Sequence, residues 1–132
     1  MEQKNRVNIA VENILEAGLG ERKLERAVQA ANDKKAVQIV VLDLKGIATF
    51  TDYFVICSGK SARQVQAISD EIEEQLLGLA VKPIHIEGYQ KAEWVLMDYG
   101  DFIVHIFVEN ARLFYDLERL WHDAGRIEVK DE

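Results

Sequence analysis

The sequence has 132 residues, 48% of them hydrophobic, and this length favours one globular domain. Its 23 acidic and 16 basic residues give a net charge of -7. This charge argues against direct or sequence-specific nucleic-acid binding, because phosphate binding needs a basic surface. The single cysteine excludes an internal disulfide, and the chain lacks the roughly 18 consecutive apolar residues of a membrane span. We therefore expect a cytoplasmic protein without membrane contact.

Residues 1–20 are expected to form an amino-terminal helical extension. Their apolar side chains recur at helical spacing, at Val7, Ala10, Val11, Ile14 and Leu15. Gly18-Leu19-Gly20 then ends the segment. Glu12 and Glu16 disfavour a secretory signal or a transit peptide. A second helix should follow, ending near Asn32-Asp33, with Leu24, Ala27, Val28 and Ala31 on its apolar face.

The next segments predict a buried strand, a second strand and a helix. Val37–Leu44 is nearly continuous in branched apolar residues, which is typical of a strand buried on both faces. A second strand is expected over Tyr53–Cys57. Ser61 followed by Gln64 fits a capping box and predicts a helix start. The apolar stripe of this helix comprises Val65, Ile68, Ile72, Leu76 and Leu79.

A short strand at Ile84–Glu87 precedes a predicted β-hairpin, Trp94–Glu109, with a type II′ turn at Gly100-Asp101. This turn places Trp94 opposite Phe107 and Leu96 opposite His105. One face should enter the core, and it comprises Val95, Met97, Tyr99, Phe102, Val104 and Ile106. The other is mixed and comprises Trp94, Leu96, Asp98, Ile103, His105 and Phe107. It either lies beneath a helix or contacts another molecule, and we expect Trp94, Asp98 and His105 to be accessible.

The last predicted helix runs from about Ala111 to Ala124. Its apolar face comprises Leu113, Phe114, Leu117, Leu120, Trp121 and Ala124, which leaves Tyr115, Glu118 and His122 on the exposed side. Residues 125–132 are expected to be an acidic flexible tail. The order of elements predicts the α/β class, with a mixed sheet of about five strands flanked by helices.

The residues carry no recognisable catalytic, cofactor or metal-binding pattern. Gly59-Lys60-Ser61 lies where a phosphate-binding loop would be, but Phe54 replaces the first glycine of a Walker A motif. Asp98 and Asp101 flank a tight turn and point apart. The three histidines lie on different elements, without metal-ligand spacing. We expect no enzyme, although a nucleotidyltransferase-like nucleotide-binding domain and a homodimeric interaction module remain alternatives.

The string E-G-Y-Q-K-A-E-W-V-L-M-D-Y-G-D-F-I-V-H-I-F, with A-R-L-F-Y-D-L-E-R-L-W after it, resembles the ribosomal silencing factor (Iojap) family. The resemblance extends to T-D-Y-F-V-I-C-S-G-K-S-A-R-Q-V upstream and runs from about Glu21 to His122, which gives a predicted domain of residues 21–124. It implies a topology related to nucleotidyltransferases without their active site. It also implies binding to the large ribosomal subunit through ribosomal protein number fourteen, which blocks joining of the small subunit and represses translation. A role in large-subunit biogenesis is implied as well.

An acidic domain with an aromatic and acidic surface suits a basic ribosomal protein. The predicted partner-binding residues are those of the mixed hairpin face and the exposed side of the last helix. They are Trp94, Asp98, His105, Glu109, Tyr115 and Glu118. The free protein is a possible homodimer through the same hairpin face.

Overall fold

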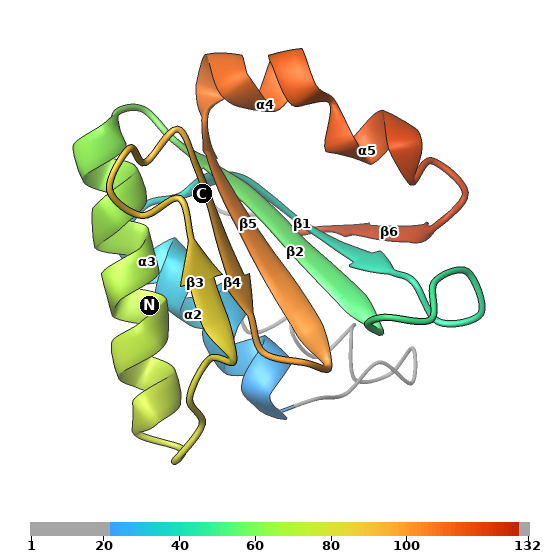
Figure 1. Ribbon diagram of the computed structural model, residues 1–132, viewed down its shortest axis with the longest axis horizontal. Helices are drawn as coiled ribbons and strands as arrows, with labels where there is room; N and C mark the ends of the chain where they lie inside the picture. The colour runs from blue at the N-terminus through green and yellow to red at the C-terminus, as the bar shows by residue number, and fades with distance from the viewer. Residues whose placement is uncertain (1–21, 130–132) are drawn as a thin grey trace.

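The computed structural model describes residues 22–129, which form a six-stranded mixed sheet with helices on both faces (Figure 1). The strand order is β3-β4-β5-β2-β1-β6. In chain order the elements are α2 (Arg22–Asp33), β1 (Val37–Asp43), β2 (Tyr53–Gly59), α3 (Ala62–Leu77), β3 (His85–Glu87), β4 (Trp94–Asp98), β5 (Phe102–Val108), α4 (Glu109–Tyr115), α5 (Leu117–Leu120) and β6 (Gly125–Glu128). The predicted α/β class is confirmed. The predicted helix near the amino terminus lies outside the described residues.

The centre of the sheet is the parallel pair β2 and β5. Every residue of β2 is buried, as its apolar sequence requires between two helical layers. The pairs β1–β2, β1–β6, β3–β4 and β4–β5 are antiparallel. The sheet is therefore mixed, as the sequence predicts.

The β4–β5 hairpin has the predicted register, with Trp94 opposite Phe107 and Leu96 opposite His105. Gly100 has a φ of 88°, which suits the first central position of a type II′ turn. The amide of Tyr99 donates to the carbonyl of Phe102 at 3.0 Å and closes the hairpin. All the residues predicted for the inner face are buried, namely Val95, Met97, Tyr99, Phe102, Val104 and Ile106.

Helices α2 and α3 cover one face of the sheet and form the larger core (Figure 1). Their buried stripes match the predicted helical periodicity, and include Leu24 and Val28 of α2 with Ile68 and Ile72 of α3. The predicted cap of α3 is confirmed, because the Gln64 amide donates to Ser61 Oγ at 3.1 Å. The inner side of the hairpin packs into this larger core, so the mixed side of the hairpin belongs to the opposite face of the sheet.

The opposite face carries α4 and α5 over a smaller core that includes Phe54, Ile56, Ile103 and Phe107 (Figure 1). The prediction of one helix from Ala111 to Ala124 is wrong. Asp116 adopts the left-handed conformation, with φ 49° and ψ 49°, and separates α4 from α5. The break redirects the second half of the segment, so that its residues do not continue one helical face.

The prediction of a flexible tail is wrong for Gly125–Glu128. These residues form β6 at one edge of the sheet, antiparallel to β1, with Ile127 opposite Val41. Ile127 and Val129 pack against the larger core, while Arg126 and Glu128 are exposed. The alternation is that of a half-buried strand, and it raises the strand count to six.

Candidate partner-binding surface

Four large apolar side chains of α4 and α5 project into solvent. Leu113, Phe114, Tyr115 and Leu120 are 81%, 79%, 50% and 72% exposed, and we refer to them as the C-terminal helical surface. The prediction that Leu113, Phe114 and Leu120 face the core is wrong, because from this stretch Ala111, Leu117, Trp121 and Ala124 pack on the smaller core instead. Several large exposed apolar side chains on one short segment are typical of a protein-binding site.

Trp94 extends this surface from the sheet, because its ring contacts that of Tyr115. The two ring centroids are 4.8 Å apart, and Phe107 stacks beneath Trp94 at 5.0 Å. Trp94 is half-buried, with an apolar body on the sheet and one edge toward solvent. The fold therefore brings together the predicted residues Trp94 and Tyr115, from two elements. Tryptophan and tyrosine in this setting are typical anchors of protein interfaces.

His105 lies behind this surface. It is 3% exposed, so the prediction that it is accessible is wrong. The ring of Phe54 lies 4.4 Å from its ring in an edge-on arrangement, and α5 lies over the same smaller core. The indole Nε1 of Trp94 donates to His105 Nδ1 at 3.1 Å. Burial lowers the pKa of His105 to about 3, so the ring is neutral at physiological pH.

Asp98 lies at the opposite end of β4 from Trp94. Asp98 is four residue steps along the strand from Trp94, which corresponds to about 13 Å. One carboxylate oxygen accepts a hydrogen bond from the Gly100 amide at 2.8 Å, and the other lies 3.9 Å from His85 Nδ1. Asp98 shares the outer face of β4 with Trp94 but lies away from the C-terminal helical surface.

The two predicted glutamates have different environments. Glu109 is exposed in the first turn of α4, at the mouth of a cavity of about 550 Å³ between α4 and the β1–β6 edge. Glu118 is half-buried, which corrects the prediction that it lies on the exposed side. It accepts from Arg112 Nε at 2.8 Å and from Arg126 Nη1 at 2.7 Å. Burial raises the pKa of Glu118, but the two arginines outweigh burial and hold that pKa below its usual value.

The described residues offer little for chemistry. Within residues 22–129, no group of three or more His, Cys, Asp or Glu side chains could hold a metal ion. Burial raises the pKa of Cys57 to about 12. In the turn before α3 the backbone amide of Lys60 already has a hydrogen-bond acceptor within the chain, because it donates to Gln64 Oε1 at 2.7 Å. Over the same range, no helix combines the length and apolar character needed to cross a bilayer.

Sequence reasoning missed the outward direction of Leu113 and Phe114 and the buried role of Arg112. No local signal was available for the two apolar residues, because at about 100° per residue they lie about 40° and 60° from Leu117 and so fall on the same wide face of a continuous helix. Arg112 gave no signal either, because its partners Gln38 and Ser58 lie far away in sequence.

Comparison with known proteins identifies relatives across most of the chain. The family model described as "Ribosomal silencing factor during starvation" matches residues 20–132. The ribosomal silencing factor of Halalkalibacterium halodurans is 47% identical, over 81% of this chain and 92% of that protein. A more distant relative, the mouse "Mitochondrial assembly of ribosomal large subunit protein 1", is 29% identical over 74% of this chain and 44% of its own length.

The fold has solved relatives as well. A crystal structure of a Bacillus halodurans protein superposes with a TM-score of 0.69 at 46% identity, and covers 74% of this chain and 91% of that chain. The family match, the relative with 47% identity and this shared fold agree. The chain belongs to the ribosomal silencing factor (Iojap) family.

Proposed function

We propose that the protein binds the large ribosomal subunit through ribosomal protein number fourteen and sterically blocks joining of the small subunit. Translation is repressed as a result, and the same contact serves large-subunit biogenesis. The observation that carries the proposal is the C-terminal helical surface, where four large apolar side chains project from a folded acidic domain. A surface of this kind needs a protein partner to bury it.

Charge supports a basic protein as that partner. The chain has a net charge of -7, and Glu109 and Asp116 are exposed on the segment that bears the apolar side chains. Complementary charge speeds encounter and fixes orientation, whereas buried apolar anchors supply most of the affinity. A basic ribosomal protein on the subunit surface meets both requirements. The name of the mouse relative supports the large subunit and a part in its assembly.

We assign the contact to a central and a peripheral part. Trp94, Tyr115, Leu113 and Phe114 supply the central anchors, and Glu109 and Asp98 supply charge at the periphery. His105 and Glu118 remain part of the proposed site, but they act from behind it because both are covered by neighbouring side chains. The mechanism is occlusion, which needs affinity and bulk rather than bond making, and it takes place in the cytoplasm.

A subunit-joining assay tests the function. Purified large subunits are incubated with saturating protein, small subunits are added, and whole ribosomes are separated by sedimentation. We expect strong loss of whole ribosomes. Unimpaired joining with the protein at saturation would overturn the proposal. Crosslinking from Phe114 should label ribosomal protein number fourteen, and labelling of a different ribosomal protein would overturn that assignment.

Paired variants locate the surface. Leu113→Asp places a charge among the apolar anchors and should weaken subunit binding at least tenfold, since it removes an anchor and leaves a charge to be buried. Leu77→Asp is the matched control, because Leu77 is a 47% exposed leucine on α3, which covers the other face of the sheet. Equal effects of the two substitutions would contradict the proposed surface.

A homodimer is the second candidate, favoured by the same exposed apolar side chains. A dimer through this surface would bury them in the free protein and compete with the ribosome. Sedimentation equilibrium of the free chain decides the question. If Leu113→Asp converts a dimer into a monomer, the surface is shared by both interactions; a monomer at all concentrations removes the dimer.

A further inference from the structure

Helices α4 and α5 are too short to be stable without contacts to the rest of the domain. They span seven and four residues, and neither has a side-chain hydrogen bond at its N-cap. Isolated helices of this length are unstable in water. The side chains that would normally fasten such helices to a core, Leu113, Phe114 and Leu120, point away from the sheet. The segment contacts the smaller core only through the partly buried side chains of Ala111, Leu117 and Trp121, so polar contacts must complete its orientation.

We propose that Arg112 and Glu118 are positioning residues that hold the C-terminal helical surface at its orientation on the sheet, with β6 as the outer anchor. This inference rests on the proposed function of that surface. It assigns Arg112, Glu118 and Arg126 an indirect part in partner binding, exerted through the free protein rather than through contact with the ribosome.

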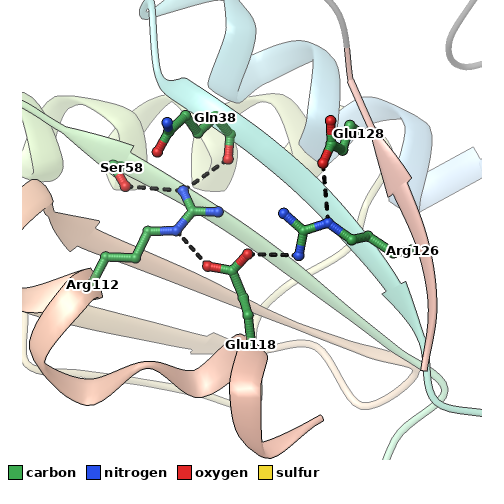
Figure 2. Close-up of polar contacts among 6 residues, drawn as sticks. All are labelled: Gln38, Ser58, Arg112, Glu118, Arg126 and Glu128. Carbon is green, nitrogen blue, oxygen red and sulfur yellow. Dashed lines mark hydrogen bonds and ion pairs between the residues drawn. The ribbon is translucent and has the colours of Figure 1, made fainter. Parts of the chain in front are cut away.

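Arg112 is the inner anchor. It is 7% exposed, and its guanidinium bonds three other segments (Figure 2). Nη1 donates to the carbonyl of Gln38 in β1 at 2.8 Å and to Ser58 Oγ in β2 at 3.0 Å, while Nε donates to Glu118 of α5 at 2.8 Å. One planar side chain thus joins α4 to two strands and to α5. Lysine cannot reproduce this geometry, because its ammonium lacks the flat fork of donors.

The backbone of β1 is shaped to receive this arginine. The β1–β2 register shifts between Val37 and Val40, and Gln38 within the shift has a φ of 53°. Few residues other than glycine adopt this conformation, and it costs energy. The bulge leaves the Gln38 carbonyl free to accept from Arg112 Nη1. The strained backbone at Gln38 therefore supplies an acceptor for the buried Arg112 guanidinium.

Glu118 also links α5 to strand β6. Its second carboxylate oxygen accepts from Arg126 Nη1 at 2.7 Å, and Arg126 Nε donates to Glu128 at 3.2 Å (Figure 2). Arg126 and Glu128 belong to β6, which pairs with β1. The network therefore runs from α4 through α5 to β6 and returns to the strand that Arg112 contacts. Removing Glu118 leaves the buried Arg112 guanidinium without its charged partner, which costs more than breaking an exposed pair.

The test compares variants of graded chemistry in the full chain. Glu118→Gln keeps the shape but removes the charge that both arginines share, and Arg112→Lys removes the planar fork. Arg63→Lys is the control, because Arg63 is an exposed arginine on α3, which covers the other face of the sheet. Each variant is examined by amide chemical shifts of the free protein and by its affinity for large subunits.

Positioning predicts two coupled results. Glu118→Gln and Arg112→Lys should shift the amide signals of residues 109–121 in the free protein while those of β4 and α3 stay in place, and both should weaken subunit binding about tenfold. Arg63→Lys should keep the wild-type signals of residues 109–121 and the wild-type affinity. If Arg112→Lys does not fold, Glu118→Gln with Arg63→Lys carries the test.

Two results would overturn the inference. Weakened binding by Glu118→Gln with unchanged signals for residues 109–121 would make Glu118 a direct contact. Shifted signals with wild-type affinity would mean that the orientation of the segment does not matter for binding. Failure of the proposed function is distinguishable from both, because wild-type protein would then not bind large subunits whatever the variants do to the free-protein spectrum.

Discussion

Trp94 and His105 are joined across the β4–β5 hairpin by a hydrogen bond from the indole Nε1 to the imidazole Nδ1, 3.1 Å long. Because Nδ1 accepts, the proton of the neutral ring is on Nε2. Among the described residues that Nε2 has no hydrogen-bond partner, and it is buried near the Phe54 ring. A buried, neutral imidazole therefore accepts the hydrogen bond that holds the Trp94 indole.

This burial predicts acid sensitivity. The folded pKa of His105 is about 3, whereas that of an unfolded histidine is about 6.5. Between these values the unfolded chain binds the extra proton, so the free energy of unfolding falls as pH falls below about 6.5, by about 2 kcal/mol at pH 5 from this group. Urea unfolding at pH 7 and pH 5 measures the difference.

His105→Phe should remove most of this pH dependence, although it also removes the acceptor of the Trp94 indole. The control is His122→Phe, which makes the same change of side chain at an exposed position. An identical acid response of wild type and His105→Phe would contradict the assignment to His105.

A pair of glycines separates backbone strain from steric clash. Gly88 has a φ of 81°, and a Cβ added there would lie 2.2 Å from the carbonyl oxygen of Trp94. Gly46 has a φ of 82° with nothing within 4 Å of such a Cβ. Gly46→Ala should cost only the roughly 1–2 kcal/mol of a left-handed alanine. Gly88→Ala should lower the free energy of unfolding clearly more and change Trp94 fluorescence. Equal losses of stability for the two variants would show that the β4 backbone shifts at no cost to accommodate the methyl group.

Asp98 can be tested without disturbing its turn. Asp98→Asn keeps an oxygen that can accept from the Gly100 amide and removes the charge. The free energy of unfolding should stay unchanged, and subunit binding should weaken several-fold if the carboxylate faces a basic partner. Asp98→Lys reverses the charge and also loses the hydrogen bond, at about 1 kcal/mol of stability. Wild-type affinity of Asp98→Asn would remove this residue from the contact.

Deleting β6 should destabilise the domain. A chain ending at Ala124 loses the pairing of β1 with Gly125–Glu128 and exposes the apolar surface beneath Ile127. We expect a loss of about 2 kcal/mol or more in chemical unfolding. A chain ending at Val129 is the control, because it keeps all of β6. Equal stability of both would indicate that β6 contributes nothing.

The hairpin could be predicted in detail from sequence, since period-two alternation from Trp94 to Phe107 around a glycine turn fixes both register and faces. The burial of His105 could not, because the rings that cover it come from elsewhere in the chain, with Phe54 on β2. Nothing local distinguishes the covered His105 from the half-buried Trp94 on the same face.

The C-terminal part shows two different failures. The break at Asp116 carries no glycine or proline, so helical spacing extends without interruption across it. Strand β6 did carry a signal, because Ile127 and Val129 alternate with Arg126 and Glu128, but the charges suggested a tail. The C-terminal helical surface lies on this part of the chain.

The parallel β2–β5 pair has a consequence for how the chain folds. Residues 60–101 separate the two strands, so the central pairing closes a long loop before any of its ladder forms. Such non-local contacts make folding slow, because the entropy of loop closure is lost before the pairing compensates for it. Helices α4 and α5 follow β5 and rest on the finished pair. In refolding experiments the C-terminal helical surface should therefore form last, after the central sheet has collapsed.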